Sequence, residues 1–270
     1  WGAPQLFSGS VDATIRQWDV VTGRCVRTLR GHTRGVDALV YNGETDQLFS
    51  ASSDTTLKQW DLETGSVLRE FKGHHTSVVA LTLYPDYLSQ QDPQNATLSS
   101  TADEEDEAEL WSGSVDKFTL QWNVRHGRVE TKLEHPNVAS SVLVTDAFAV
   151  TGCRDEHVRV WDKATGKLVK TLVGHFDEVT GIAMISQTLY TASLDGTVRR
   201  WPLGKILRDK SPVFDALQSI REAKVEGDNS QSDVTRTASA KVKPLANPQS
   251  ALTEEEEREL AELMSDLDDE

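Results

Sequence analysis

The sequence predicts an all-β fold built from repeated antiparallel sheets. A tryptophan recurs at spacings of 42, 62, 39 and 40 residues. In every copy an aspartate lies six residues before the tryptophan, and a serine or threonine lies four residues before that aspartate. Around these positions apolar and polar residues alternate with the period of a half-buried strand. The five tryptophans are Trp18, Trp60, Trp122, Trp161 and Trp201.

Each copy predicts four strands in order, joined by an Asp-containing turn, a Thr-Gly-type turn and a Gly-His loop. A sheet of about 40 residues cannot bury both of its faces alone, so neighbouring copies must stack face to face. Radial stacking closes such copies into a propeller. Residues 1–203 are therefore expected to form five blades, at approximately 5–30, 31–72, 73–134, 135–173 and 174–203.

Four histidines stand at matching places in the copies, three of them in Gly-His pairs and the fourth after Glu134. In the interior of a sheet, an imidazole, a hydroxyl and a carboxylate must satisfy one another's hydrogen bonds. Together with the Trp-Asp pairs at Trp18, Trp60 and Trp161, these features resemble the WD40-repeat family over about residues 5–203.

The resemblance implies that a His, a Ser or Thr, an Asp and a Trp form a hydrogen-bonded tetrad in each complete blade. The third copy departs from the family by having Asn123 after its tryptophan, and the fifth by having Pro202. The four expected tetrads are His32–Ser50–Asp54–Trp60, His74–Ser112–Asp116–Trp122, His135–Thr151–Asp155–Trp161 and His175–Thr191–Asp195–Trp201.

The two end copies are incomplete. The first begins at its second strand, QLFSGS, and the fifth is followed by PLGKILRDKSPV, which is a poor fourth strand. Because propellers of the family usually have seven blades, we expect a truncated seven-bladed propeller, with roughly 80–100 residues preceding Trp1 in the intact protein.

The third copy contains an insertion at 85–109, between its first and second strands. Its composition of Gln, Ser, Asp and Glu predicts a disordered acidic loop. Two interpretations remain open: the insertion is merely tolerated, or it contacts a basic partner or regulates binding.

Beyond the repeats, 204–250 is expected to be a mostly disordered linker, and 251–267 an acidic amphipathic helix. Thr253 and Glu256 have the spacing of a capping box. The apolar face of this helix would bind a partner groove, dock on the propeller, or have no role. It consists of Leu260, Leu263, Met264 and Leu267.

The net charge of −15 comes mainly from two segments. Residues 85–110 hold eight acids and no base, and 254–270 hold ten acids and one base. Without a basic stripe, nucleic-acid binding is not expected. No apolar run reaches the roughly 20 residues of a membrane span. Two cysteines are too few for a disulfide framework, which favours an intracellular protein of the cytoplasm, the nucleus or both.

The residues offer little for catalysis. No metal, cofactor or catalytic site is expected, because no histidine pair has zinc-ligand spacing and no phosphate-binding loop or nucleophile elbow is present. The repeated Ser, His and Asp residues could suggest a hydrolase triad. Four equivalent sets argue against it, since a scaffold needs one set per blade whereas an enzyme needs one in total. The chain is therefore not expected to be an enzyme.

The remaining interpretation is a non-catalytic adaptor, a monomeric propeller within a complex, that binds proteins or peptides on its faces. The resemblance points to the top face, where Arg154 and Phe176 are expected to anchor a peptide with an acidic or phosphorylated group. An alternative is a substrate receptor of a ubiquitin ligase, with an F-box in a missing N-terminal part. The candidate contact residues are Arg34, Lys117, Phe118, Arg154, His157 and Phe176.

Overall fold

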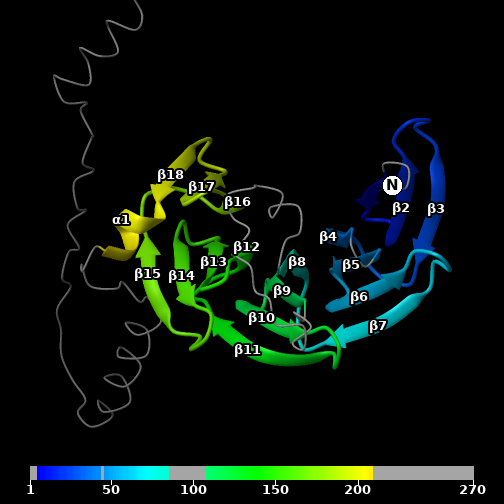
Figure 1. Cartoon of the computed structure of the whole chain (residues 1–270), viewed down its shortest axis with the longest axis horizontal. Helices are drawn as coiled ribbons and strands as arrows, with labels where there is room; N and C mark the ends of the chain where they lie inside the picture. The colour runs from blue at the N-terminus through cyan, green and yellow to red at the C-terminus, as the bar shows by residue number, and fades with distance from the viewer. Residues whose placement is uncertain (1–4, 44–45, 85–107, 209–270) are drawn as a thin grey trace, which may run out of the picture. The chain divides into compact units, whose positions relative to one another are not determined.

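The computed structural model describes residues 5–43, 46–84 and 108–208. These residues form strands β1 to β18 in five antiparallel sheets, followed by one short helix (Figure 1). The all-β prediction is confirmed. The sheets follow one another in chain order, and each consists of strands that are consecutive in the sequence, as expected for stacked meanders.

The first sheet has three strands and the next two have four each. Their bounds are β1 Gln5–Gly9, β2 Thr14–Asp19 and β3 Cys25–Arg30; β4 Val36–Asn42, β5 Gln47–Ser52, β6 Thr56–Asp61 and β7 Val67–Lys72; β8 Val78–Tyr84, β9 Glu109–Ser114, β10 Phe118–Asn123 and β11 Arg128–Glu134.

The fourth sheet has four strands and the fifth has three. Their bounds are β12 Ala139–Val144, β13 Phe148–Cys153, β14 Val158–Asp162 and β15 Leu168–Leu172; β16 Val179–Ile185, β17 Thr188–Ser193 and β18 Val198–Pro202. The recurring tryptophans lie on β2, β6, β10, β14 and β18, which are corresponding strands of successive sheets.

The Thr-Gly-type turns need a left-handed backbone. Gly65 has φ +76° and Gly166 has φ +65°, and both follow the Trp-Asp pair of their sheet. Glycine adopts this region without steric cost, whereas a side chain is disfavoured there. The turn is completed by the aspartate, since the carboxylate of Asp61 accepts hydrogen bonds from the backbone N–H of Glu63, at 2.8 Å, and from the hydroxyl of Thr64, at 2.6 Å.

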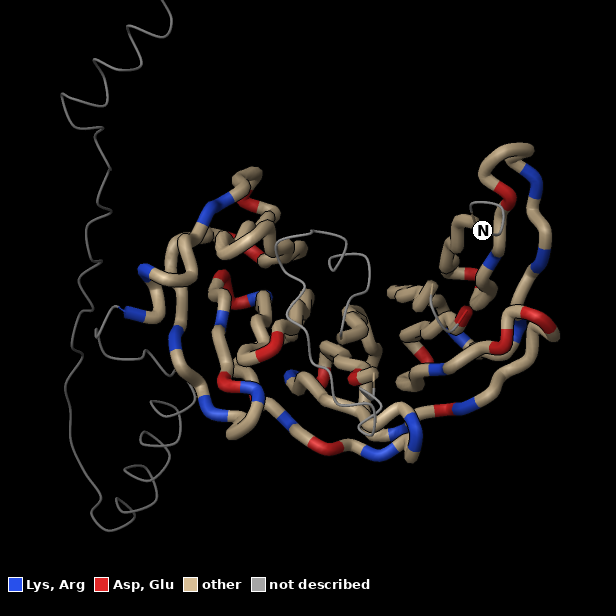
Figure 2. Tube along the Cα trace, viewed as in Figure 1, with Lys and Arg blue, Asp and Glu red and all other residues tan. Residues whose placement is uncertain are grey.

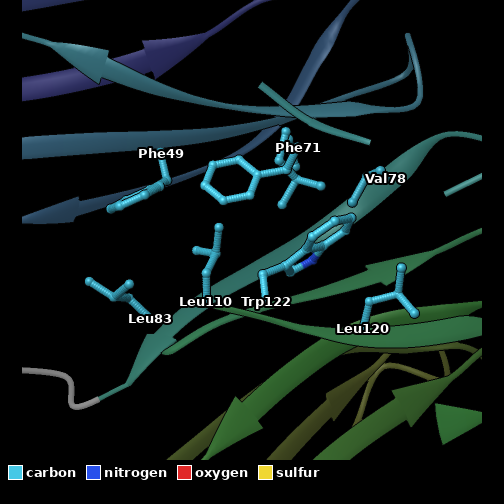
Figure 3. Packing of buried hydrophobic residues seen from close by; sticks show 9 residues of the cluster. Phe49, Phe71, Val78, Leu83, Leu110, Leu120 and Trp122 are labelled. Atoms are coloured by element: carbon cyan, nitrogen blue, oxygen red, sulfur yellow. The ribbon is translucent and has the colours of Figure 1, made fainter. Parts of the chain in front are cut away.

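The core lies between neighbouring sheets. Between the second and third sheets, Phe49 and Phe71 pack against Leu110 and Trp122, all of which are almost completely buried (Figure 3). Between the first and second sheets, Trp60 packs on the side chains of β2 and β3. Burying one such side chain contributes roughly 1.5–3 kcal/mol, so stacking of the sheets is the main source of stability.

The second strand of one sheet lies close to the first strand of the next sheet. This proximity requires a small residue on the second strand. A Cβ atom at Gly113 would lie 2.6 Å from the carbonyl oxygen of Ala139 in the next sheet. The corresponding position in the second sheet is Ala51, which is fully buried. The close contact between neighbouring sheets therefore explains the small residue at the centre of the Ser-small-Ser pattern.

Two boundaries differ from the sequence predictions. Residues Leu203–Arg208, assigned mostly to the linker 204–250, form the helix α1, which contacts β15 and β18. Ile206 is partly buried and packs against the apolar cluster of the fourth and fifth sheets. The insertion predicted for 85–109 ends earlier, because Glu109 already belongs to β9.

Other predictions concern residues outside the described part of the chain. They are the loop character of 85–107, the linker beyond Arg208 and the helix at 251–267 with Leu260, Leu263, Met264 and Leu267. Lys and Arg as well as Asp and Glu are distributed over all five described sheets (Figure 2).

Candidate interaction face

In the second sheet, a chain of hydrogen bonds joins the four residues of the expected tetrad. His32 donates through Nδ1 to Asp54 Oδ2 at 2.8 Å, because a carboxylate can only accept. Its Nε2 then accepts from the Ser50 hydroxyl at 2.7 Å. Ser50 in turn accepts from the indole N–H of Trp60 at 2.8 Å. The His32 imidazole and the Ser50 hydroxyl are buried. Both ring nitrogens and the hydroxyl are hydrogen-bonded within the tetrad.

The third and fifth sheets repeat this arrangement. His74 lies 2.9 Å from Asp116 and 2.8 Å from Ser112. His175 lies 3.0 Å from Asp195 and 2.7 Å from Thr191. Trp122 and Trp201 donate to the same hydroxyls, each at 2.8 Å. Each aspartate also accepts the backbone N–H of the residue that follows the histidine, which fixes that loop against the turn.

The fourth sheet departs from the expected tetrad. Trp161 donates to Thr151 at 2.9 Å, but His135 does not reach Asp155. Its ring instead lies 3.0 Å from the Thr119 hydroxyl and 3.6 Å from the Cys153 sulfur. The expectation that His135, Thr151, Asp155 and Trp161 form one set is therefore wrong for the histidine and the aspartate.

The reason is a loop that is one residue shorter. In the other repeats a two-residue step such as Arg30–Gly31 separates the last buried leucine or phenylalanine from the histidine, whereas only Glu134 separates Leu133 from His135. The N–H of His135 then bonds to the Lys117 carbonyl at 2.8 Å, which continues the pairing of β11 with β10. The side chain consequently points to a different set of neighbours.

Asp54 and Asp116 are held ionised by their surroundings. Burial raises the pKa of Asp54, but hydrogen bonds from Thr56, the Thr33 N–H and His32 outweigh it and lower that pKa to about 2. Asp116 follows the same logic, with burial opposed by His74 and the His75 N–H, and its pKa is also about 2. Burial, followed by the Arg159 charge, lowers the pKa of His135 to about 3, so this imidazole is neutral.

Hydroxyls buried in this way are poorly placed for nucleophilic catalysis. Ser50, Ser112 and Thr191 are almost completely buried, and each hydroxyl oxygen is occupied by an indole N–H. In the fourth sheet, burial raises the pKa of the Cys153 thiol to about 12, which disfavours the reactive thiolate. The hydrogen-bonded His, Ser or Thr, and Asp side chains therefore serve to hold a turn against a loop.

In the second, third and fifth sheets the tetrad joins the turn before the third strand to the loop before the first strand. We call the edge of the sheets at which these turns and loops lie the top face. The top face comprises the turns 10–13, 53–55, 115–117, 154–157 and 194–197 and the loops 31–35, 73–77, 135–138 and 174–178. At the turn position just before the aspartate, apolar side chains are exposed to solvent. They are Val11, 91% exposed, Val115, 41%, and Leu194, 63%.

Two of the candidate contact residues lie together on this face. Arg154, whose side chain is 62% exposed, forms an ion pair with Glu178 across the boundary between the fourth and fifth sheets, with its Nε atom 3.2 Å from the carboxylate. Phe176 belongs to the same loop as Glu178 and is 77% exposed. The Arg199 guanidinium lies 5.7 Å from the centre of its ring.

The other candidates are less available. Phe118 is half-buried against the core between the second and third sheets, with the Lys132 ammonium 3.6 Å from its ring centre. His157 is half-buried and bonds to the Asp155 carbonyl. Arg34 and Lys117 are exposed, Lys117 with a φ of +71°.

Sequence reasoning did not identify Glu178, the partner of Arg154. It directly precedes β16, at the position that Gly35, Ser77 and Val138 occupy in the earlier sheets. A charged residue at this one repeat position was the only pattern that could have indicated it.

Neither a group of metal ligands nor a membrane-spanning helix occurs in the described ranges. Among residues 5–43, 46–84 and 108–208, no three His, Cys, Asp or Glu side chains are grouped so as to hold a metal ion. Within the same ranges, no helix combines the length and hydropathy that a membrane span requires.

Comparisons with known proteins agree with this geometry. The family model described as "WD domain, G-beta repeat" matches residues 23–61 and 166–202. Each matched segment begins at the glycine of a Thr-Gly turn and runs through one outer strand, one loop and the next three strands, ending at or just after the strand that holds the tryptophan.

Three relatives illustrate the similarity. A WD repeat-containing protein of Schizosaccharomyces pombe is 31% identical over 97% of this chain and 72% of its own length. The nuclear distribution protein PAC1 of Arthroderma otae is 31% identical over 79% of the chain and 41% of its own length. The nuclear distribution protein nudF of Emericella nidulans is 29% identical over 74% of the chain, which spans 57% of that relative.

The repeated strand order, the buried His, hydroxyl and Asp sets, and the similarity over most of the Schizosaccharomyces pombe protein agree with one another. The chain belongs to the WD40-repeat family.

Proposed function

We propose that the chain is a non-catalytic interaction scaffold that binds segments of partner proteins on its top face. The observation that supports this most directly is the group of exposed apolar side chains on that face, namely Val11, Val115, Phe176 and Leu194. Phe176 and Leu194 belong to a loop and a turn that hydrogen bonds join, and exposed apolar side chains that lie together commonly mark an interaction site. Val115, Phe176 and Leu194 lie on turns and loops that the tetrads of the third and fifth sheets hold together, so binding them costs little conformational entropy.

The relatives are compatible with this role. WD40-repeat proteins generally act as interaction scaffolds, and two of the relatives are named for nuclear distribution. Those names describe whole proteins, of which this chain spans about two fifths in one case and somewhat over half in the other. We propose an intracellular adaptor that acts as a monomeric propeller in a complex. Nothing in the comparisons supports the ubiquitin-ligase alternative.

Cross-linking mass spectrometry of the affinity-purified full chain tests the proposal. Lys117 is exposed on the top face, and Lys167 is exposed on the turn between β14 and β15, at the opposite end of the sheets. Partner cross-links should form at Lys117 and be rare at Lys167. The opposite distribution would refute a top-face interaction.

A matched pair of variants gives an independent check. Phe176→Asp together with Leu194→Asp should reduce recovery of the partners. Val21→Asp should leave recovery unchanged, because Val21 is 76% exposed but lies on the turn between β2 and β3. Equal losses in both variants would contradict the proposal.

A further inference from the structure

The loop 175–178 is fixed to the turn 193–195 by several hydrogen bonds. The N–H of Phe176 donates to Asp195 at 3.0 Å, the N–H of Leu194 donates to the Glu178 carbonyl at 3.0 Å, and the Ser193 hydroxyl donates to the Asp177 carbonyl at 3.0 Å. This rigid corner presents Phe176 and Leu194, and Arg154 joins it from the neighbouring sheet through Glu178. We call Arg154, Phe176, Glu178 and Leu194 the fourth–fifth sector.

We propose that the fourth–fifth sector binds a short partner segment in which a carboxylate lies beside a bulky apolar side chain. The inference rests on the proposed function and specifies the chemistry of what is bound. Its first support is the geometry of Arg154. The Nε atom lies 3.2 Å from the Glu178 carboxylate in an ion pair, and the Arg154 side chain is 62% exposed. A guanidinium paired through Nε can still present its two terminal N–H groups to the two oxygens of a carboxylate.

The second support is the apolar pair beside this fork. Phe176 and Leu194 expose 77% and 63% of their surface. The Arg199 guanidinium lies 5.7 Å from the centre of the Phe176 ring. The exposed faces of the ring and of the leucine can accept an aromatic or aliphatic side chain.

The sector differs from the corresponding places at the other sheet boundaries. There the same two repeat positions hold Val11 with Gly35, Ser53 with Ser77, and Val115 with Val138. In the first of these pairs a Cβ on Gly35 would lie 3.3 Å from Val11, which shows how close the two positions are. Only the pair at the fourth–fifth boundary is charged, so an anionic group has one preferred place among the described boundaries.

The neighbouring charges favour a carboxylate over a phosphate. Glu156, Asp177 and Glu178 all lie within two residues of Arg154, Phe176 or each other in the turn and the loop. Asp177 is exposed, and its carboxylate accepts the N–H of Glu178 at 2.7 Å. These acids repel any anion beside Arg154, and they repel a phosphate with a charge of about −1.5 to −2 more strongly than a carboxylate with a single charge.

The test begins with a phage-displayed library of random heptapeptides selected on the full chain. The most enriched peptide is then synthesised in three forms, with its acidic residue retained, replaced by the amide, or replaced by phosphoserine. Isothermal titration calorimetry measures their affinities for the natural chain and for Arg154→Glu, Arg154→Lys, Phe176→Ala and Arg24→Glu. Arg24 is an exposed arginine on the turn between β2 and β3 and is the matched control.

Enrichment of an acidic residue next to an aromatic or aliphatic one is expected. Arg154→Glu and the amide peptide should each weaken binding roughly ten- to hundredfold, the loss typical of a charged hydrogen-bonded contact. Arg154→Lys should weaken it less, and Arg24→Glu should leave it unchanged. A melting temperature equal to that of the natural chain shows that Arg154→Glu acts on binding and not on folding, and Phe176→Ala gives a second, independent reduction.

Three results would overturn the inference: no enrichment of acidic peptides, tighter binding of the phosphoserine form, or equal binding by Arg154→Glu. Peptides that are insensitive to Arg154→Glu but lost on Val11→Asp would leave the top-face function standing while removing this sector as its site. Loss of all top-face cross-links to partners, by contrast, would remove the proposed function itself.

Discussion

Arg159 donates two hydrogen bonds to Asp155, from Nη1 at 3.0 Å and from Nη2 at 2.6 Å, and so occupies the carboxylate that a histidine engages in three other sheets. The guanidinium is almost completely buried. In the fourth sheet, the ion pair between Arg159 and Asp155 thus holds the turn within one hairpin. His135 contacts Thr119 and Cys153 instead of the aspartate.

Arg159→Met is expected to lower the free energy of unfolding by about 3 kcal/mol, because it leaves Asp155 without its main partner in a largely buried site. Chemical denaturation measures the change. Arg16→Met is the control: Arg16 holds the same repeat position in the first sheet, but its side chain is 48% exposed and lies 3.8 Å from Asp12. It should cost less than about 1 kcal/mol. Similar losses in both variants would contradict the importance of the buried pair.

The stability of the chain should fall as the pH decreases from about 6.5 towards 3. Burial lowers the pKa of His135 to about 3, from a usual value of 6.5. Below pH 6.5 the unfolded chain therefore takes up a proton that the folded chain does not, and folding becomes less favourable until the pH falls through the folded pKa. His32, whose pKa is also lowered by burial, acts in the same direction.

Urea denaturation at pH 7, 6, 5 and 4.5 measures this slope. His135→Gln should flatten it without removing it, since His32 still contributes. Asp54 and Asp116, with pKa values of about 2, lose their contribution mainly below pH 4 and do not confuse this window. An unchanged slope in His135→Gln would show that this histidine is not the neutral group that its burial requires.

Gly113→Ala is expected to destabilise the chain by about 1–3 kcal/mol, because the new Cβ would lie 2.6 Å from a backbone oxygen of the next sheet. Gly43→Ala is the matched control, since its Cβ would meet only the Tyr41 ring at 3.6 Å. Thermal unfolding compares the two variants. Equal melting temperatures would mean that neighbouring sheets separate easily at this point.

Sequence reasoning placed the strands well because their pattern is repeated and local. Trp60 and Trp122 mark the third strand of their sheets, and the small residues Ala51 and Gly113 mark the contact with the next sheet. The tetrad in the fourth sheet could not be predicted from the spacing of its aspartate and tryptophan alone, because the missing residue lies before His135. A shift of one residue changes the face on which a strand side chain lies.

The sector around Arg154 was only partly predictable for a related reason. Arg154 and Phe176 are recognisable from the repeat, because each directly adjoins a tetrad residue in the sequence. Glu178 can pair with Arg154 only because stacking of the sheets brings the start of β16 to the turn of the preceding sheet. Contacts between repeats depend on how the sheets pack, and a pattern within one repeat does not contain that information.

The hairpin of β8 and β9 should tolerate removal of the insertion that separates its strands. Tyr84 and Glu109 are paired residues of adjacent antiparallel strands. Both are anchored to the fourth sheet: the Tyr84 hydroxyl donates to Asp146, and the Glu109 carboxylate accepts from Lys163 at 3.0 Å. In the fifth sheet a two-residue turn, Ser186–Gln187, joins the paired residues Ile185 and Thr188, so the repeat accommodates such a connection.

Replacing 85–108 by Asn-Gly, a sequence that favours two-residue hairpin turns, should therefore leave the melting temperature within a few degrees of the natural value, about what a change of 1 kcal/mol produces. Circular dichroism and thermal unfolding make the comparison. Lys163→Met in the shortened chain should lower the melting temperature, because it removes the contact that fixes Glu109. Loss of cooperative unfolding in the shortened chain alone would show that residues of the insertion are part of the folded unit, and the interpretation as a tolerated insertion would then fail.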